Sequence, residues 1–322
     1  MSGELAVDLG TSRTRVMDGS LGAIVDEATL AAVELGSGRL LAFGEKAVRM
    51  RGRVAGEVEI VRPVRRGQLQ DLGLTDQICA ALISRARRSG GGRPAVLCSI
   101  PGASTSVQKR ALEQSFRSAG ARRVDFLGHA FAGGVASRLR LDEPVASMVM
   151  DVGAGVTDVA VIALGGIVTE ASVPVGGDDF DLAVRELCLR SFDLVIDSGT
   201  AERVKRALGS AWPLEELKAE VHGRDSSSGA PRSVVLSRGE VAAVLVDRVD
   251  QIVAAAVSCI TTAPPDLADD LLSRGLHLVG EGGFLDGFGR RLATAAGLPV
   301  HFAEEPARAA VSGAARCLGQ AR

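Results

Sequence analysis

Two segments of the chain repeat one short pattern, an apolar run that ends in Asp-x-Gly. The first copy, residues 6–11, reads AVDLGT, and the second, residues 150–157, reads MDVGAGVT. Each copy continues into a β-rich stretch, at 13–16 and at 159–169, and residues 164–166 (LGG) supply the turn chemistry of a hairpin. A chain with a duplicated strand and turn is constrained to two similar halves, so we expect two lobes that face each other.

The length of 322 residues suits two domains of ordinary size. Short apolar runs alternate with helical patterns, which is typical of an α/β fold with a largely parallel sheet. Residues 104–119 have apolar residues at helical spacing and an N-cap at Ser104 or Thr105. We expect the lobes to divide near residues 141–144 and the last helix, about 305–318, to return to the first lobe. The candidate strands are 5–9, 95–100, 124–127, 148–152, 159–164 and 276–279.

The repeated strand ends carry the residues of a phosphate-binding turn. Backbone N–H groups that follow Asp8 and Asp151 can point at a phosphate, and the two carboxylates can orient a Mg²⁺ ion with its waters. One such turn alone is as readily the ordinary end of a strand, but two in facing lobes would clamp a phosphate chain from both sides. A third Gly-rich turn, 280–284, suits close approach of a ribose or adenine, or is a plain strand-to-helix turn.

The composition excludes several classes of function. The 37 Lys and Arg residues are balanced by 39 Asp and Glu residues, a formal net charge of −2, so nucleic acid is not expected as a partner. An aromatic content of 3% without any Tyr argues against aromatic stacking platforms. The five cysteines have no C-x-x-C spacing, which indicates free thiols, and neither a basic leader nor a long apolar run is present. These features predict a cytoplasmic protein.

The order and spacing of further blocks make the chain similar to the actin-like ATPases, specifically the bacterial cell-shape protein MreB and its close relatives. Nearly the whole chain takes part in this resemblance. The matching blocks are 61–71, 108–111, 119–122, 151–162, 175–181, 200–205, 209–211, 222–225, 264–267 and 297–306.

The resemblance implies an actin-like, ribonuclease H-like duplicated α/β fold with a central cleft for ATP or ADP and Mg²⁺. The first lobe would hold residues 1–143 with the returning helix 305–320, and the second lobe residues 144–304. For the pair Glu202 and Lys205, an exposed ion pair one helical turn apart is the plain alternative to an adenosine contact. The implied nucleotide contacts are Gly10, Thr11, Ser12 and Arg13 in the first loop, Gly153, Ala154, Gly155 and Val156 in the second, Glu202, Arg203, Val204 and Lys205 at the adenosine, and Gly280, Glu281, Gly282, Gly283 and Phe284 in the third turn, with Asp8 and Asp151 at the metal.

The chain departs from the family pattern at three positions in this cleft. Where MreB-like proteins have Glu-Glu-Pro for the attacking water, residues 128–130 read GHA, so both carboxylates are missing. A neutral His129 could hold the water, or the side chain has a structural use. Glu281 replaces a glycine and brings negative charge toward the phosphates, while Arg13 replaces the usual Asn and could pair with phosphate.

The expected function is that of a cell-shape cytoskeletal protein, at most a weak ATPase, that forms or modulates filaments with itself or with a paralogous actin-like filament. The alternative is a catalytically silent scaffold that caps or braces such a filament. Cell-wall synthesis membrane proteins are further expected partners. The basic loop 85–93 would either lie on anionic headgroups, giving peripheral contact at the inner membrane face, or be a solvated turn.

Overall fold

The computed structural model describes residues 3–19, 22–54, 56–88 and 92–318. Two five-stranded sheets form the centre of the molecule, and they have the same topology. In each sheet, the central strand and the two strands on one side of it are parallel to one another. On its other side, the central strand continues into an antiparallel meander of two further strands. The first sheet has the order β10 (Arg123–Gly128), β9 (Ala95–Ile100), β1 (Glu4–Leu9), β2 (Arg13–Asp18), β3 (Gly22–Ala28), and the second β18 (Val300–Phe302), β17 (Leu276–Val279), β11 (Ser147–Val152), β12 (Thr157–Ala163), β13 (Gly166–Val173).

The duplication seen in the sequence is therefore a duplication of whole sheets. The expectation of a largely parallel sheet was wrong, because each repeat feeds its central strand directly into a hairpin. The two-residue turn between β12 and β13 has Leu164 at φ 52° and Gly165 at φ 72°. A type I′ hairpin turn requires this left-handed conformation at both of its central positions.

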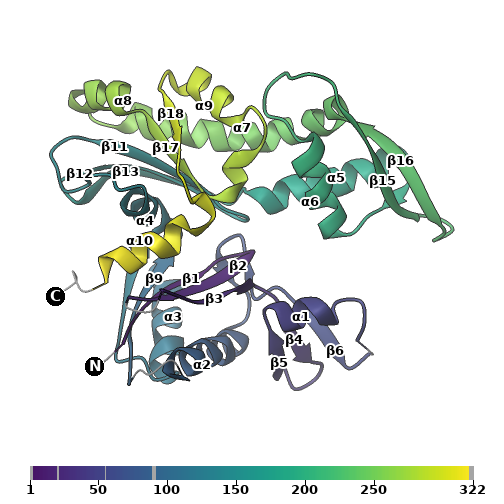
Figure 1. The fold of residues 1–322 in the computed structure, drawn as a ribbon, viewed down its shortest axis with the longest axis horizontal. Coiled ribbons are helices and arrows are strands. Elements are labelled where there is room, and N and C mark those ends of the chain that lie inside the picture. The colour runs from purple at the N-terminus through teal and green to yellow at the C-terminus, as the bar shows by residue number, and fades with distance from the viewer. Residues whose placement is uncertain (1–2, 20–21, 55, 89–91, 319–322) are drawn as a thin grey trace.

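Helices cover both faces of the sheets (Figure 1). The outer face of the first sheet packs on α2 (Leu72–Arg88) and α3 (Ser106–Ser118), and the outer face of the second on α5 (Gly177–Phe192) and α7 (Arg238–Thr262). Helix α3 begins after Thr105, whose hydroxyl accepts a hydrogen bond from the Gln108 amide in a capping box. Thr105 is one of the two residues predicted as the N-cap of this helix. The remaining helices of the upper half are α6 (Ser198–Leu208), α8 (Ala268–Arg274) and α9 (Phe288–Ala296).

Two short helices, α4 (His129–Ala136) and α10 (Ala309–Cys317), lie between the two sheets (Figure 1). Val311 and Ala314 of α10 pack on Ala6 and Leu97 of the first sheet, while α4 packs on the inner face of the second. The two helices cross so closely that a Cβ on Gly313 would lie 1.8 Å from the carbonyl oxygen of Ala132. This pair of helices is the shared layer between the halves.

Two smaller units lie at the other end of each half, on the right of Figure 1. The lower one contains β4 (Ala31–Glu34), β5 (Leu40–Phe43), α1 (Glu45–Met50) and β6 (Val58–Val61), followed by the hairpin β7 (Val64–Arg65) and β8 (Gln68–Leu69). The upper one contains β14 (Leu194–Val195), β15 (Lys218–Asp225) and β16 (Pro231–Ser237). The division into lobes at residue 143 stays a prediction.

No helix within these described ranges is long and apolar enough to span a membrane. Of the basic loop 85–93, residues 89–91 and the side chains of 87 and 88 lie outside the part that the structure describes, as do residues 319–320 of the predicted last helix. Arg85 forms an ion pair with Glu27 at 2.9 Å.

Candidate nucleotide cleft

A cleft of about 450 Å³ lies between the halves, a volume suited to a small-molecule ligand. Three glycine turns meet in it: the turns after β1 and β11, and the 3₁₀ turn Glu281–Phe284 after β17. The predicted residues that line this cleft are Asp8, Gly10, Thr11, Ser12, Arg13, His129, Asp151, Gly153, Ala154, Gly155, Val156, Glu202, Lys205, Gly280, Glu281, Gly282 and Phe284.

Three of the predicted contacts do not line the cleft. Arg203 donates to the Thr200 hydroxyl at 2.8 Å, and Val204 is buried in the core of the second half. Gly283 is buried, and a Cβ there would lie 2.9 Å from the Leu278 side chain. The residues of α6 that line the cleft share one face of the helix, so helical phase explains why residues 203 and 204 turn away. They are Ser198, Gly199, Glu202, Lys205 and Arg206.

The two repeated turns have the same hydrogen bond. The Gly10 amide donates to the Arg13 carbonyl at 3.1 Å, and the Gly153 amide donates to the Val156 carbonyl at 2.9 Å. A Cβ on Gly10 would lie only 2.8 Å from the Arg13 carbonyl oxygen, so the tight turn requires glycine. The duplicated motif thus gives a duplicated backbone geometry.

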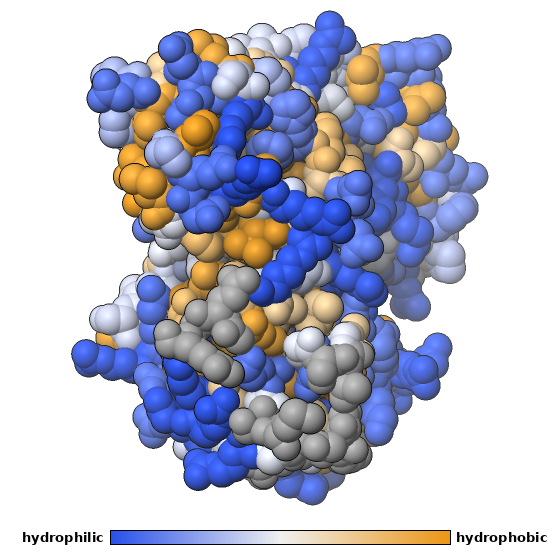
Figure 2. All heavy atoms as spheres, turned by 60° about the vertical axis from the view of Figure 1, so that its left-hand side comes forward, coloured by the Kyte–Doolittle hydropathy of each residue, from blue (hydrophilic) through white to orange (hydrophobic). Residues whose placement is uncertain are grey.

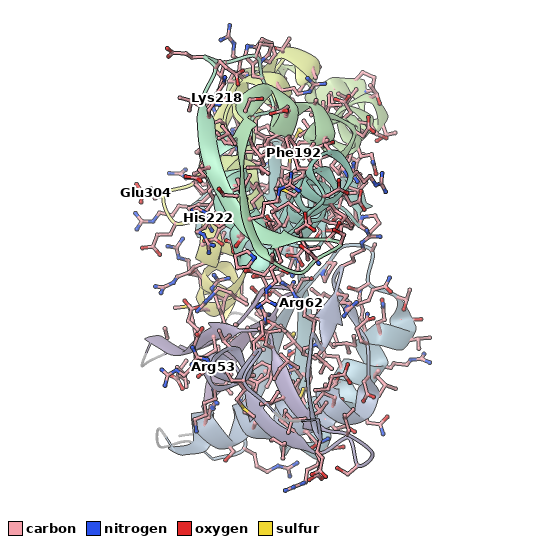
Figure 3. All side chains as sticks on the ribbon, turned by 90° about the vertical axis from the view of Figure 1, so that its right-hand side faces the viewer. Arg53, Arg62, Phe192, Lys218, His222 and Glu304 are labelled. Atoms are coloured by element: carbon pink, nitrogen blue, oxygen red, sulfur yellow. The ribbon has the colours of Figure 1, made fainter. Side chains whose placement is uncertain are left out.

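The turns of the two halves face each other across the cleft. Thr11 Oγ1 accepts from the Gly67 amide at 3.0 Å, and a Cβ on Gly155 would lie 2.7 Å from that same oxygen. Arg62 and Arg66 form ion pairs with Asp178 and Asp179 at the start of α5. Figure 3 shows Arg62 at the junction of the lower and upper halves. These ion pairs were not predicted from the sequence, although both partners fall in blocks that matched the family.

The ion pair between Glu202 and Lys205, the plain alternative of the sequence analysis, is not formed. Lys205 Nζ lies 2.9 Å from Asp181 and donates to the Gly177 carbonyl at 3.3 Å. Glu202 instead pairs with Arg206 at 2.9 Å. Both side chains therefore line the cleft with separate partners.

His129 begins α4 and lies among carboxylates. Its Nδ1 is 3.1 Å from Asp158 Oδ2, and its Nε2 is 3.8 Å from Asp8 Oδ1. Burial by itself would lower the pKa of His129, but the hydrogen bond with Asp158 and the charges of Asp158, Asp8 and Asp151 raise that pKa to about 9. The ring is protonated at neutral pH and has no acceptor nitrogen, so it lacks what a neutral imidazole would offer to an attacking water.

The buried carboxylates respond to the same surroundings. Burial is the main cause that raises the pKa of Asp151 to about 6; the charge of His129 opposes this, and the charges of Asp158 and Asp8 add to it. Burial also raises the pKa of Asp8, against the charges of His129 and Arg15. The ionised state of Asp8 and Asp151 at this end of the cleft therefore depends on positive charge from His129 and Arg15.

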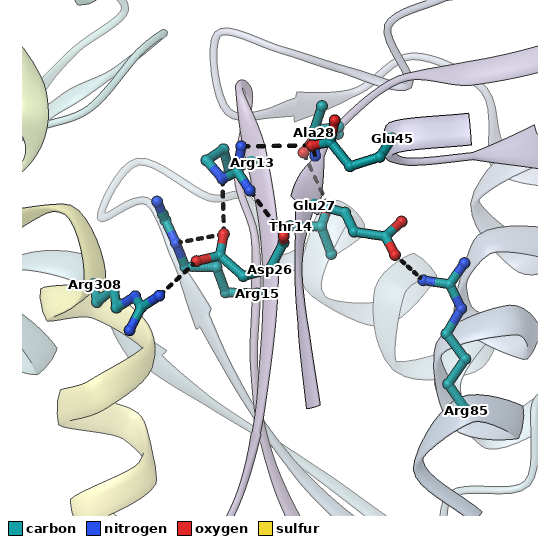
Figure 4. Close-up of polar contacts among 10 residues, drawn as sticks. Arg13, Thr14, Arg15, Asp26, Glu27, Ala28, Glu45, Arg85 and Arg308 are labelled. Atoms are coloured by element: carbon teal, nitrogen blue, oxygen red, sulfur yellow. Dashed lines mark hydrogen bonds and ion pairs between the residues drawn. The ribbon is translucent and has the colours of Figure 1, made fainter. Parts of the chain in front are cut away.

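Arg13 is held by the protein itself. Its Nε is 2.7 Å from Asp26 Oδ1, and Nη1 is 3.7 Å from Glu45 (Figure 4). The predicted pairing of Arg13 with a phosphate would have to compete with this contact. Arg15, which the sequence analysis did not single out, also lines the cleft and lies 3.3 Å from the same Asp26 oxygen. Alternation along β2 was the signal that could have found it, because Asp8 and Arg15 are register partners.

We predict that His129 makes the free energy of unfolding decrease as the pH becomes alkaline. A pKa raised from 6.5 to about 9 on folding stabilises the protein fully below pH 6.5, and this contribution is lost as pH rises through 9. The loss amounts to about 3 kcal/mol. Urea unfolding of wild type and His129→Gln at pH 6 and pH 9.5 measures it: the stability advantage of wild type should shrink by this amount. A gap that is constant with pH would contradict the prediction.

We predict that removing the charge of Glu281 tightens nucleotide binding. Glu281 is exposed in the third turn and lines the cleft, so its carboxylate repels phosphate, but solvent limits the effect to under about 1 kcal/mol, or about fivefold in affinity. Titration of a labelled ATP analogue against wild type and Glu281→Gln at low and high salt tests this. The gain should fall with salt, and equal affinities at low salt would show that the side chain does not act on the phosphates.

Solved structures identify the class of protein that this fold and cleft define. The crystal structure of MreB5 of Spiroplasma citri bound to ADP matches with a TM-score of 0.92 at 25% identity, over 99% of this chain and 97% of that chain. The MamK double helical filament matches with a TM-score of 0.78 at 19% identity over 98% of both chains, a likeness that shows the fold alone. The chain has the actin-like fold that its duplicated turns and block order predicted.

The sequence comparisons give the family. The family model for MreB/Mbl protein matches residues 2–322. Cell shape-determining protein MreB of Escherichia coli (strain K12) is 34% identical over 324 residues, which cover 98% of this chain and 93% of the relative. Cell shape-determining protein Mbl of Bacillus subtilis (strain 168) is 31% identical over 305 residues, or 94% and 92%. The chain belongs to the MreB/Mbl family, and the resemblance found in its motifs is confirmed.

Proposed function

We propose that this protein is a cytoskeletal protein of the cell-shape system that binds ATP or ADP in the cleft and assembles with itself. The observation that carries the proposal is the pair of equivalent phosphate turns facing each other in a fold that matches ADP-bound MreB5 over 99% of the chain. A second structure of that protein, bound to AMPPNP, matches with a TM-score of 0.91. The curated relatives are named as cell shape-determining proteins.

The nucleotide would lie with its phosphates between the turns 10–13 and 153–156. Adjacent backbone N–H groups in turns of this kind favour an anion. The adenosine would lie between the cleft face of α6, with Glu202 and Lys205, and the third turn, where a Cβ on Gly282 would be 3.0 Å from the Gly153 carbonyl oxygen. In this proposal the cleft divides a lobe of residues 1–143, completed by the last helix, from a lobe of residues 144–304.

Assembly would use surfaces outside the cleft. The β12–β13 hairpin exposes Leu164, Ile167 and Val168, and α8 exposes Leu272. Figure 2 shows the molecule from the side that Figure 1 has on its left, where hydrophobic residues gather in patches between charged ones. Exposed apolar patches of this kind suit contacts with another protein. We further propose a cytoplasmic location, with cell-wall synthesis membrane proteins as partners and peripheral contact at the inner membrane face.

Sedimentation and light scattering over a range of protein concentrations, with and without ATP, test the proposal. We expect pelleting that begins above a threshold concentration and responds to nucleotide. A chain that stays monomeric under all these conditions and ignores a paralogous filament would overturn it.

A second candidate is the silent scaffold that caps or braces a paralogous filament. The protonated His129 in the place of a catalytic carboxylate favours it, because such a cleft is suited to hold a nucleotide without turning it over. This candidate predicts that the protein pellets only when the paralogous filament is present.

A further inference from the structure

Two exposed phenylalanines stack on each other at the edge of the cleft. Within the described ranges, Phe284 in the third turn is 54% exposed and Phe302 at the end of β18 is 51% exposed, while the other phenylalanines are buried or half-buried. The two ring centroids are 5.9 Å apart, and the rings are inclined by 23° to each other. Burial of such a pair against a ligand would remove a large apolar surface from water. The pair is therefore a candidate for ligand recognition.

The outer ring of the stack is supported by the fold. Phe302 lies over Gly289 of α9, where a Cβ would be 2.7 Å from the tip of the ring, so the ring fills the space of a side chain at position 289. Strands β17 and β18 are parallel neighbours (Figure 1), and the Ala303 amide donates to the Leu278 carbonyl at 3.0 Å. These contacts fix Phe302 beside the third turn, which follows β17.

The backbone of the third turn places Phe284 at the cleft. A Cβ on Gly282 would lie 2.6 Å from the Val152 side chain, and one on Gly283 would lie 2.9 Å from the side chain at position 278, so these two residues pack too tightly for side chains. Phe284 is the next residue, and it lines the cleft, whereas Phe302 does not. The ring of Phe284 therefore lies between the cleft and Phe302.

The third turn and α6 line the same end of the cleft. At the end of α6, a Cβ on Gly209 would lie 2.7 Å from the Leu285 side chain, so the two elements meet there. The pKa of Arg206 is raised mainly by its hydrogen bond with Glu202, and the charge of Glu281 in the third turn adds to this effect. An aromatic ring on one element and hydrogen-bonding side chains on the other suit a planar ligand with apolar faces and polar edges.

Of the parts of a nucleotide, the base fits this description. Phosphates and ribose are hydrated and gain little from a phenyl ring, whereas every base has a π-face that stacks on one. Removal of the aromatic residue from such a stack weakens binding by about tenfold. A purine covers more of the ring than a pyrimidine does. The low aromatic content of the chain argued against stacking platforms, but a single supported ring is sufficient for one base.

We propose that the nucleobase stacks on Phe284, and that this contact makes the cleft select purine over pyrimidine nucleotides. Phe302 is a positioning residue, because it acts on the base through the ring of Phe284. The inference rests on the proposed nucleotide binding. It goes beyond that proposal by naming the side chain that distinguishes one base from another.

Isothermal titration calorimetry with ADP and with CDP, each with excess Mg²⁺, tests the inference. CDP has an exocyclic amine as ADP does but a smaller ring, so the ratio of the two affinities reports on stacking. For wild type we expect ADP to bind about tenfold more tightly than CDP. Phe284→Ala should weaken ADP binding by about tenfold and reduce the ratio to about threefold or less. Phe284→Tyr retains the ring and should bind both nucleotides as wild type does.

Phe302→Ala tests the positioning role. The ring of Phe284 loses its support in this variant, so the ADP affinity should fall by about threefold and the ratio of ADP to CDP affinity should fall with it. Leu189→Ala is the matched control, because Leu189 on α5 is 46% exposed and lies outside the cleft lining. Thermal unfolding without nucleotide shows whether each variant is folded.

Unchanged ADP affinity in Phe284→Ala would overturn the inference and leave the proposed function intact. An equal loss of ADP and CDP affinity would overturn it too, because damage to the turn alone would affect both nucleotides alike. Failure of the wild-type protein to bind either nucleotide would overturn the proposed function as well.

Discussion

Purified protein incubated with ATP should release phosphate only at a trace rate, even when the cleft is filled. Positioning of the attacking water by an acid or base contributes about 10²–10⁴-fold to such reactions. Residues 128–130 offer no carboxylate, and His129 uses Nδ1 on Asp158 and is protonated at neutral pH. We therefore expect turnover lower by this factor than with a carboxylate at position 129.

Single-turnover and steady-state phosphate release on wild type, His129→Glu and His129→Gln measure this effect. His129→Glu restores a carboxylate and should raise the rate, while His129→Gln should leave it at background. Asp151→Ala shows whether any release depends on the cleft. Robust release by wild type that disappears in both Asp151→Ala and His129→Gln would mean that the imidazole does take part in the reaction.

Gly313→Ala should destabilise the protein by about 3 kcal/mol or more, or prevent folding. The added methyl group would lie 1.8 Å from the Ala132 carbonyl oxygen, and backbone cannot move aside as a flexible side chain can. Overpacking of this kind costs about 1–3 kcal/mol and occasionally more. For a chain of 322 residues, we expect the midpoint of thermal unfolding to fall by roughly 4 °C or more.

Gly239→Ala is the matched control on another helix. A Cβ there would lie 3.5 Å from the Glu216 carboxylate, an ordinary contact, so the change should stay within about 0.5 kcal/mol. Calorimetry or circular dichroism of both variants beside wild type gives the comparison. Equal unfolding temperatures for Gly313→Ala and wild type would show that α4 and α10 can separate without cost.

The central strands could be predicted from the sequence because they are continuous apolar runs. Residues 95–100 and 276–279 are β9 and β17 to the residue. The smaller sheets, β4–β6 and β14–β16, were not predicted, since most residues of their strands are half-buried or exposed. Val107 shows the same limit within a helix: it fits the apolar spacing of α3 but is 72% exposed.

The repeated turns of the cleft could also be predicted, because duplication made a weak motif specific. The contacts of His129 with Asp158, and of Arg62 with Asp178, could not, because each joins segments far apart in the chain whose approach only the fold determines. Family resemblance indicated that position 129 was unusual but did not indicate what the histidine would contact. The bound nucleotide and Mg²⁺ remain predictions.

The helix that lies last in the structure has a consequence for the order in which the chain can fold. Domains generally fold in the order of synthesis, from the N-terminus onward. Here the inner face of the N-terminal sheet is covered by Val311 and Ala314, which leave the ribosome after all the strands of the second sheet. Until then Ala6 and Leu97 lack the apolar cover that α10 provides, so the first half cannot reach its final form ahead of the second. Completion of the two halves is a single late event, and a nascent chain cannot present a finished subunit to a growing polymer.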